Sequence, residues 1–78
     1  MLEKRSFSLS GHRTSIALEA EFWAALEAIA ETRNRSLAAL IGGIDSSRTP
    51  EQPLASALRV YALEQYPIIL NRRFNMIG

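Results

Sequence analysis

Between residues 13 and 18 the side chains alternate in character from one position to the next. Two sets interleave, the first polar or small and the second mostly apolar: Arg13, Ser15 and Ala17, and Thr14, Ile16 and Leu18. Because successive side chains of a strand point to opposite faces, this alternation is typical of a strand with one buried face. The pattern therefore predicts a strand over residues 13–18 whose first set faces the solvent.

A second alternation precedes it over residues 5–9, where larger side chains alternate with Ser6 and Ser8. Ser10-Gly11-His12 then supplies a turn or kink, because glycine adopts positive φ without a steric penalty. Two interpretations are open: residues 5–9 fold back on residues 13–18 as a hairpin, or they continue as an extended arm. We favour the arm, because a second copy of the chain needs the edge of the strand.

The first expected helix runs from Glu19 to Arg33. Its apolar face repeats at helical spacing and consists of Phe22, Leu26, Ile29 and Ala30. Asn34 follows, and asparagine is second only to glycine in the left-handed conformation that commonly ends a helix. The sequence therefore predicts a helix that ends in a tight turn at Asn34 and Arg35.

Residues 36–44 form the second expected helix, with Ser36 as its N-cap. Its apolar stripe consists of Leu37, Leu40, Ile41 and Ile44. Gly42-Gly43 lies within it, although each glycine costs on the order of 1 kcal/mol in a helix interior. Either the pair allows a twin helix to approach closely, or the helix weakens there.

A loop over residues 45–48 precedes a third expected helix. Thr49 fits the N-cap of that helix, Pro50 its first helical position and Gln52 the capping-box partner. Pro67 should end the helix, because the residue before a proline avoids helical backbone angles. The tail after it is first apolar and then basic, and the pattern fits either a docked arm or a short strand.

The composition narrows the possible classes of protein. Seventy-eight residues make one small domain, and the absence of cysteine excludes disulfides and thiolate metal sites. Hydrophobic residues make up 47% of the chain, and surplus apolar surface points to a partner subunit. The net charge of +1 is low for a nucleic-acid-binding protein. No signal-peptide pattern and no apolar run near the ~20 residues of a membrane span occur, so we expect a cytoplasmic protein without membrane contact.

Candidate catalytic chemistry is sparse. His12 is the only histidine, so no second histidine can join it in a metal site. Glu27 and Glu31 share a helix face at i, i+4 spacing, which is more simply a solvated surface. Gly42-Gly43 lacks the lysine and the spacing of a phosphate-binding loop. We therefore expect no enzyme activity, no catalytic or metal-binding residue and no cofactor.

The succession of strand, helix, tight turn and helix within residues 13–44 resembles the ribbon-helix-helix family of DNA-binding dimers. Four phrases are similar to a bacterial subfamily of short proteins in which a third helix follows: Gly11-His12-Arg13-Thr14-Ser15, Glu21-Phe22-Trp23, Ile44-Asp45 and Ser56-Ala57-Leu58-Arg59-Val60. The resemblance covers about residues 5–66. It implies a mainly α fold with one short β-ribbon and a third C-terminal helix, in an intertwined homodimer held by strand 13–18 and helix two.

The resemblance also implies which side chains contact base edges in the major groove, namely Arg13, Ser15 and Ala17. Arg13 would read guanine through a bidentate contact, and Ser15 would hydrogen-bond a base or a phosphate. Ala17 would at most touch a thymine methyl group. Family members further bind a phosphate with backbone N–H groups at the start of helix two. The corresponding residues here are Ser36 and Leu37, with Arg35 adding charge.

Two departures from the family pattern bear on this interpretation. Ala20 stands where the family usually has proline at the start of the first helix. A hairpin over residues 5–9 would extend the dimer's ribbon to four strands, and such a sheet approaches or exceeds the ~12 Å width of the major groove. DNA binding would then require the outer strands to peel away.

The expected organisation has four parts: an arm or extra short strand over 1–12, the ribbon-helix-helix core over 13–46, the third helix over 47–66 and a tail over 67–78. The expected function is that of a homodimeric regulator, a repressor that binds double-stranded DNA. The alternative is a homodimeric protein-interaction module, antitoxin-like or an adaptor, that binds a partner protein instead of DNA. The near-neutral charge and the apolar tail favour that alternative.

Overall fold

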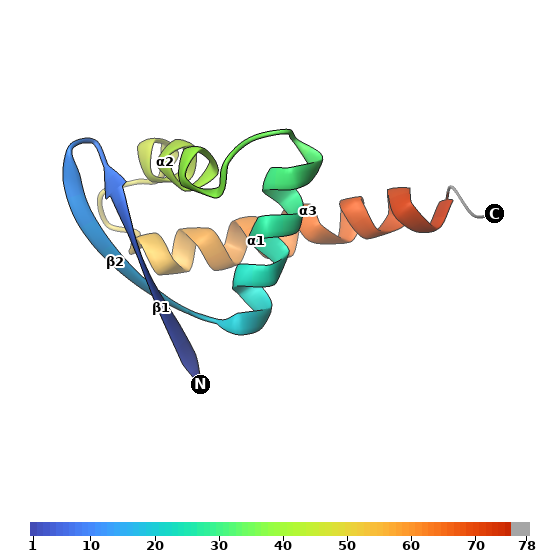
Figure 1. Cartoon of the computed structure of the whole chain (residues 1–78), viewed down its shortest axis with the longest axis horizontal. Coiled ribbons are helices and arrows are strands. Elements are labelled where there is room, and N and C mark those ends of the chain that lie inside the picture. Colours follow the sequence, from blue (N-terminus) through green and yellow to red (C-terminus); the bar gives the residue numbers. More distant parts are fainter. Residues whose placement is uncertain (76–78) are drawn as a thin grey trace.

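Two strands and three helices make up the described chain in the computed structural model (Figure 1). The structure describes the backbone of residues 1–75 and the side chains of residues 1–67. In chain order the elements are β1 (Leu2–Leu9), β2 (His12–Glu19), α1 (Ala20–Thr32), α2 (Leu37–Ser47) and α3 (Leu54–Asn75). The predicted fold class, mainly α with one short β-ribbon and a third helix, is confirmed.

The two strands pair antiparallel and are joined by a two-residue turn. Ser10 and Gly11 form this turn with φ angles of 51° and 80°. Positive φ at both positions is typical of a type I′ turn, whose twist matches that of paired strands. The extended arm predicted for residues 5–9 is therefore wrong. The tight turn returns the chain on itself, and the buried side chain of Leu9 fixes the strand against the core.

The junction between α1 and α2 is confirmed as predicted. Asn34 has a φ of 55°, in the left-handed region. Its N–H donates to the carbonyl of Glu31 at 3.0 Å, and the N–H of Arg35 donates to the carbonyl of Ala30 at 2.9 Å. This pair of bonds is the Schellman motif, which satisfies carbonyls at a helix end.

The predicted N-cap of α2 is also confirmed, because the Ser36 hydroxyl accepts a hydrogen bond from the N–H of Ala39 at 3.1 Å. The helix continues to Ser47, so the loop predicted over residues 45–48 is wrong for its first three residues. The Ser47 hydroxyl donates to the carbonyl of Gly43 at 3.0 Å. This bond supplies a donor to one of the last carbonyls of the helix, which have few backbone N–H partners within it.

The predicted start of α3 is wrong, because the helix begins at Leu54 and not at Pro50. Gln52 precedes Pro53, and a residue before a proline is disfavoured in the helical region. The chain therefore makes a separate turn first, in which the N–H of Gln52 donates to the carbonyl of Thr49 at 3.1 Å.

The predicted end of α3 is wrong as well, because the helix contains Pro67 and continues to Asn75. The proline removes one helical hydrogen bond, the one to the carbonyl of Leu63. Leu63 is 66% exposed, so water can solvate that carbonyl. Residues 68–75 are helical, which excludes the predicted short strand for them. Residues 76–78 lie outside the described part of the chain.

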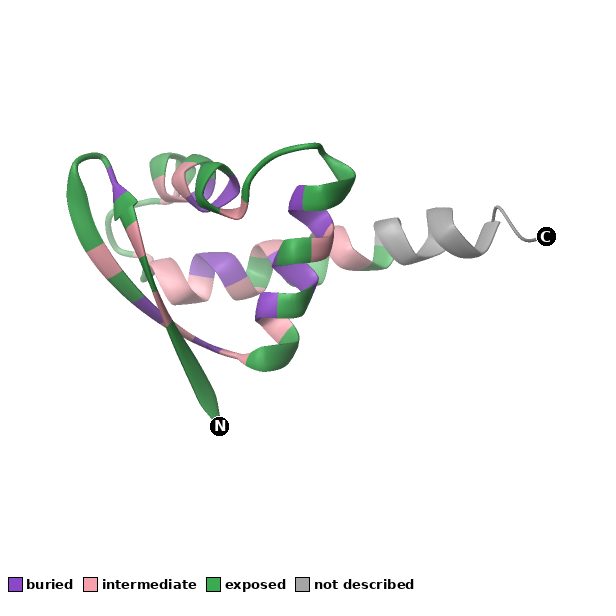
Figure 2. Cartoon of the chain, viewed as in Figure 1, coloured by how far each residue is buried: buried purple, intermediate pink, exposed green. Residues whose placement is uncertain are grey.

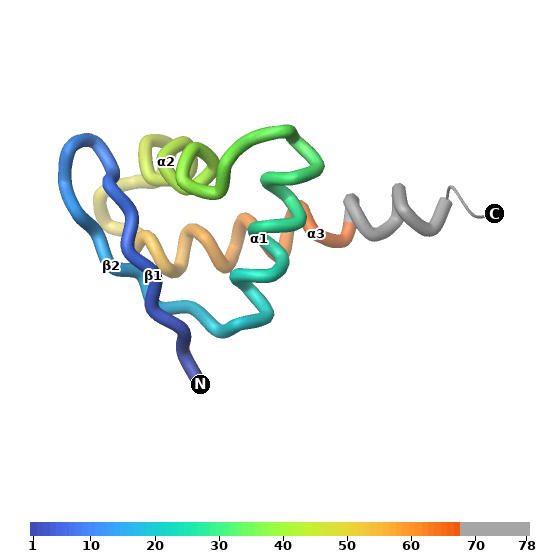
Figure 3. The backbone as a smooth tube through the Cα atoms, in the orientation of Figure 1, coloured from blue at the N-terminus to red at the C-terminus, as the bar shows by residue number. Residues whose placement is uncertain are grey.

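The core lies between the inward face of the hairpin and the three helices (Figures 2 and 3). Its largest fully buried side chains come from β2 and from all three helices: Leu18, Trp23, Leu26, Ile29, Leu40, Ile41 and Leu58. β2 contacts both α1 and α3, so the single chain covers the apolar face of the strand itself. The third helix therefore completes the core.

Replacement of Asn34 by alanine tests the turn between α1 and α2. A side chain with an ordinary Cβ costs about 1–2 kcal/mol in the left-handed conformation, so Asn34→Ala should lower the free energy of unfolding by about 1 kcal/mol. Asn34→Gly is the matched control and should stay close to the wild type. Urea denaturation measures both, and an alanine variant as stable as the glycine variant would contradict the assigned role.

Candidate functional site

The outward side of β2 carries the side chains that the alternation predicted. Arg13 and Ser15 are exposed and Ala17 is half-buried, whereas Ile16 and Leu18 on the other side are 4% and 0% exposed. A polar row thus faces the solvent directly above an apolar row that packs on α1 and α3. The helices hold this row in a fixed orientation, since its inward neighbours are locked in the core.

β1 extends the polar surface with side chains that the sequence interpretation did not include. The register places Lys4 opposite Ala17, Ser6 opposite Ser15 and Ser8 opposite Arg13, and directly opposed residues share a face. These six residues are called the outer hairpin face below. Lys4, Ser6 and Ser8 are exposed, and the hydroxyls of Ser6 and Ser15 lie 3.1 Å apart in a hydrogen bond. The serines at alternate positions of residues 5–9 were the available signal.

The charge of the outer hairpin face is wholly positive, from Lys4 and Arg13. Glu19 continues the outward alternation of β2, but Arg59 of α3 donates to its carboxylate at 2.9 Å. The hydrogen bond from Arg59 holds the pKa of Glu19 below its usual range. The negative charge at the end of β2 is thus paired with the positive charge of Arg59 on α3.

The inward side of β1 is fixed to α1 through Trp23. The indole N–H donates to the carbonyl of Glu3 at 2.8 Å, and the Phe7 ring lies 5.8 Å from the indole ring. The Arg5 guanidinium stacks over the indole at 4.9 Å and pairs with Glu27 at 2.9 Å. Adjacent cations of β1 therefore have different surroundings, because Lys4 faces the solvent and Arg5 lies against α1.

One edge of β2 is occupied by β1, and the other is free of strands. Within residues 1–75 the sheet has two strands, so no described strand pairs with the second edge of β2. A strand edge presents N–H and C=O groups that can pair with a further strand. A further strand that paired with β2 would therefore use this second edge.

The start of α2 presents free backbone donors. Ser36 and Ala38 are exposed and Leu37 is half-buried, while the Ser36 hydroxyl uses the N–H of Ala39. The remaining N–H groups of the first turn lie at the positive end of the helix dipole, where anions bind. The Arg35 guanidinium lies one turn further on, donating to the carbonyl of Ala39 at 3.1 Å. The three predicted phosphate-binding residues are thus adjacent, with the Arg35 charge displaced along the helix.

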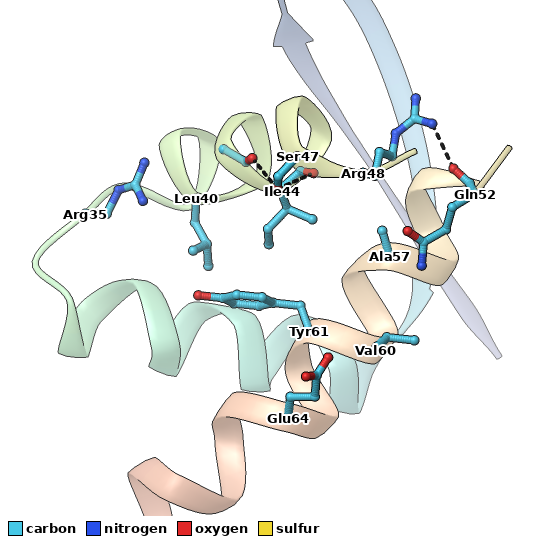
Figure 4. A pocket seen from close by; sticks show the side chains of 11 residues that line it. Arg35, Leu40, Ile44, Ser47, Arg48, Gln52, Ala57, Val60, Tyr61 and Glu64 are labelled. Carbon is cyan, nitrogen blue, oxygen red and sulfur yellow. Dashed lines mark hydrogen bonds between the residues drawn. The ribbon is translucent and has the colours of Figure 1, made fainter. Parts of the chain in front are cut away.

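A cavity of about 370 Å³ lies between α2 and α3 (Figure 4). Arg35 and Tyr61 are among its lining residues. Arg48 also lines it, but its guanidinium is held by Asp45 at 2.8 Å and by the carbonyl of Gln52 at 2.7 Å. The Arg48 guanidinium thus ties the end of α2 to the segment before α3.

Over the part of the chain that the structure describes, no three His, Cys, Asp or Glu side chains come together in a group able to hold a metal ion. His12, the single histidine of the sequence, is exposed at the start of β2. Among the described helices, none combines the length and the apolar character that crossing a membrane requires.

Comparison with known proteins gives one match. A family model described as a ribbon-helix-helix domain matches residues 2–66, which include the hairpin, α1, α2 and most of the described part of α3. No curated protein and no solved structure matched the chain.

Replacement of Trp23 by phenylalanine tests how β1 is held. The variant loses the hydrogen bond to the Glu3 carbonyl and part of the surface under Arg5, so the free energy of unfolding should fall by about 1–3 kcal/mol. Amide hydrogen exchange should accelerate more in β1 than in α2. Equal exchange in β1 before and after the substitution would show that the strand is anchored by something else.

Proposed function

Because the chain belongs to the ribbon-helix-helix family, we propose that it is a sequence-specific DNA-binding transcriptional repressor that acts as a homodimer. Domains of this family are generally DNA-binding regulators or antitoxins and are not enzymatic. The observation that carries the proposal is the outward row of β2, where Arg13 and Ser15 are exposed beside a free strand edge. A regulator of this kind acts in the cytoplasm of a bacterium.

The free edge of β2 supplies the dimer contact. Two copies of β2 pair antiparallel about a twofold axis, which places two sets of Arg13, Ser15 and Ala17 side by side on one surface. A two-stranded ribbon fits the major groove of B-DNA. Arg13 makes the bidentate contact with guanine, Ser15 hydrogen-bonds a base or a phosphate, and Ala17 contacts a thymine methyl group.

Phosphate binding at the start of α2 fixes the dimer on the duplex. The N–H groups at Ser36 and Leu37 bind a backbone phosphate, and Arg35 swings from the Ala39 carbonyl to add its charge. The exposure of Arg35 and Ser36 supports this role, because neither side chain has to leave the core.

Substitution of Arg13 should remove sequence discrimination. Arg13→Ala should weaken binding to the specific site by about 1–3 kcal/mol per contact, and much less to unrelated duplex. Arg13→Lys is the matched control, since it keeps the charge but loses the planar fork, and it should retain non-specific affinity without discrimination. Fluorescence polarisation against fragments that include the protein's own promoter measures both. Full discrimination by Arg13→Ala would contradict insertion of β2 into the groove.

The assembly and its electrostatics give a second test. Light scattering should yield twice the chain mass of 8.7 kDa, and affinity for DNA should fall steeply with salt because bound phosphates release counterions. A chain that stays at the mass of one copy under binding conditions, or binds with no salt dependence, would contradict the proposal.

A second candidate function is supported by an apolar groove between α1 and α3. The groove has a volume of about 500 Å³ and is lined by Phe22, Leu63 and Tyr66 among others, with Leu63 66% exposed. Such a surface suits an antitoxin-like or adaptor module that holds a partner protein. A stoichiometric protein complex that Leu63→Asp abolishes, formed by a chain that fails to shift DNA, would favour this candidate over the repressor.

A further inference from the structure

The hairpin sets the width of the sheet that a dimer would present to DNA. With the two copies of β2 paired at the centre of the sheet, the strand order is β1, β2, the partner's β2 and the partner's β1. At about 4.8 Å between neighbouring strands, the two outer strands lie roughly 14 Å apart, more than the ~12 Å width of the groove. The central pair fits into the groove, and the outer strands come to lie above its rims.

The outer strands are fixed in this position. The indole N–H of Trp23 donates to the Glu3 carbonyl at 2.8 Å, and Arg5 pairs with Glu27 at 2.9 Å. Leu9, at the end of β1, is 6% exposed. Detachment of β1 would break these contacts as well as the strand pairing. We therefore expect β1 to stay in the sheet when β2 meets DNA, instead of peeling away as the width of the sheet first suggested, with its outward side chains facing the groove rims, where the phosphates run.

The outward side chains of β1 have the chemistry that phosphates require. Lys4 carries a free charge on the solvent side, and Ser6 and Ser8 add hydroxyl donors. Lysine and serine are common phosphate ligands in protein–DNA complexes, and such contacts position the protein without reading sequence. Lys4 makes no ion pair with any side chain that the structure describes.

We propose that β1 is a second DNA-binding element, in which Lys4 binds the phosphate backbone at the rim of the groove that β2 enters. The inference rests on the proposed DNA-binding function and assigns β1 a part in it. Lys4 and Arg13 together give the outer hairpin face two cations per chain, hence four per dimer. The low net charge of the whole chain is thus distributed so that the DNA-facing side is positive.

The salt dependence of binding tests this role. Each phosphate contact contributes about 0.9 to the slope of log affinity against log salt concentration, so loss of two Lys4 contacts per dimer should reduce the slope by about 2. Lys4→Gln should show this reduction, and it should weaken binding to the specific duplex and to an unrelated duplex by the same factor. Lys4→Arg keeps the charge and should keep the wild-type slope.

Lys4 is also the only lysine of the chain, which allows a measurement on the unmodified protein. Acetylation of its ε-amine, followed by mass spectrometry, should slow severalfold when saturating duplex DNA is present. A wild-type protein that binds no duplex would overturn the proposed function and this inference together. A wild-type protein that binds DNA while its Lys4 is acetylated at the same rate, and whose Lys4→Gln variant keeps the full slope, would overturn only the inference about β1.

Discussion

The pairing of β2 with β1 along one edge is the constraint on which the rest of the molecule depends. It leaves β2 with a single edge for another strand, and it fixes which side chains share the outward surface. The turn at Ser10 and Gly11 makes the pairing local, since both residues take the positive φ that a tight hairpin needs. In the proposed dimer, the same pairing would determine how wide a surface faces DNA and which of its strands could enter the major groove.

The third helix helps to bury the apolar face of β2 within a single chain. Both α1 and α3 contact β2, whose Ile16 and Leu18 are 4% and 0% exposed, so the third helix adds to the cover that α1 gives this strand within one chain. Leu58 of α3 is fully buried in the same core. The helices thus build the core without a second chain, and in the proposed dimer the second edge of β2 would serve for assembly.

Local patterns predicted much of this structure, and the failures have physical causes. The alternation over residues 13–18, the left-handed Asn34 and the Ser36 cap were all correct, because each depends on neighbours in sequence. Both predicted ends of α3 were wrong because of a proline. Pro53 disfavours helical angles at Gln52 and so delays the start of the helix, and Pro67 is tolerated inside the helix, where it is exposed. Local rules do not show whether solvent can satisfy a carbonyl that a proline leaves unpaired.

The outer hairpin face was predicted only for its β2 half, for a similar reason. The outward row of β2 could be read from its own alternation, but the contribution of Lys4 depends on a register that the turn and Trp23 establish together. That register also makes β1 intolerant of insertions and deletions. Removing one residue between Arg5 and the turn would exchange the two faces of the preceding segment, bringing Lys4 onto the indole and exposing Arg5. A shift of one residue along β1 thus separates Arg5, which pairs with α1, from Lys4, which faces the solvent.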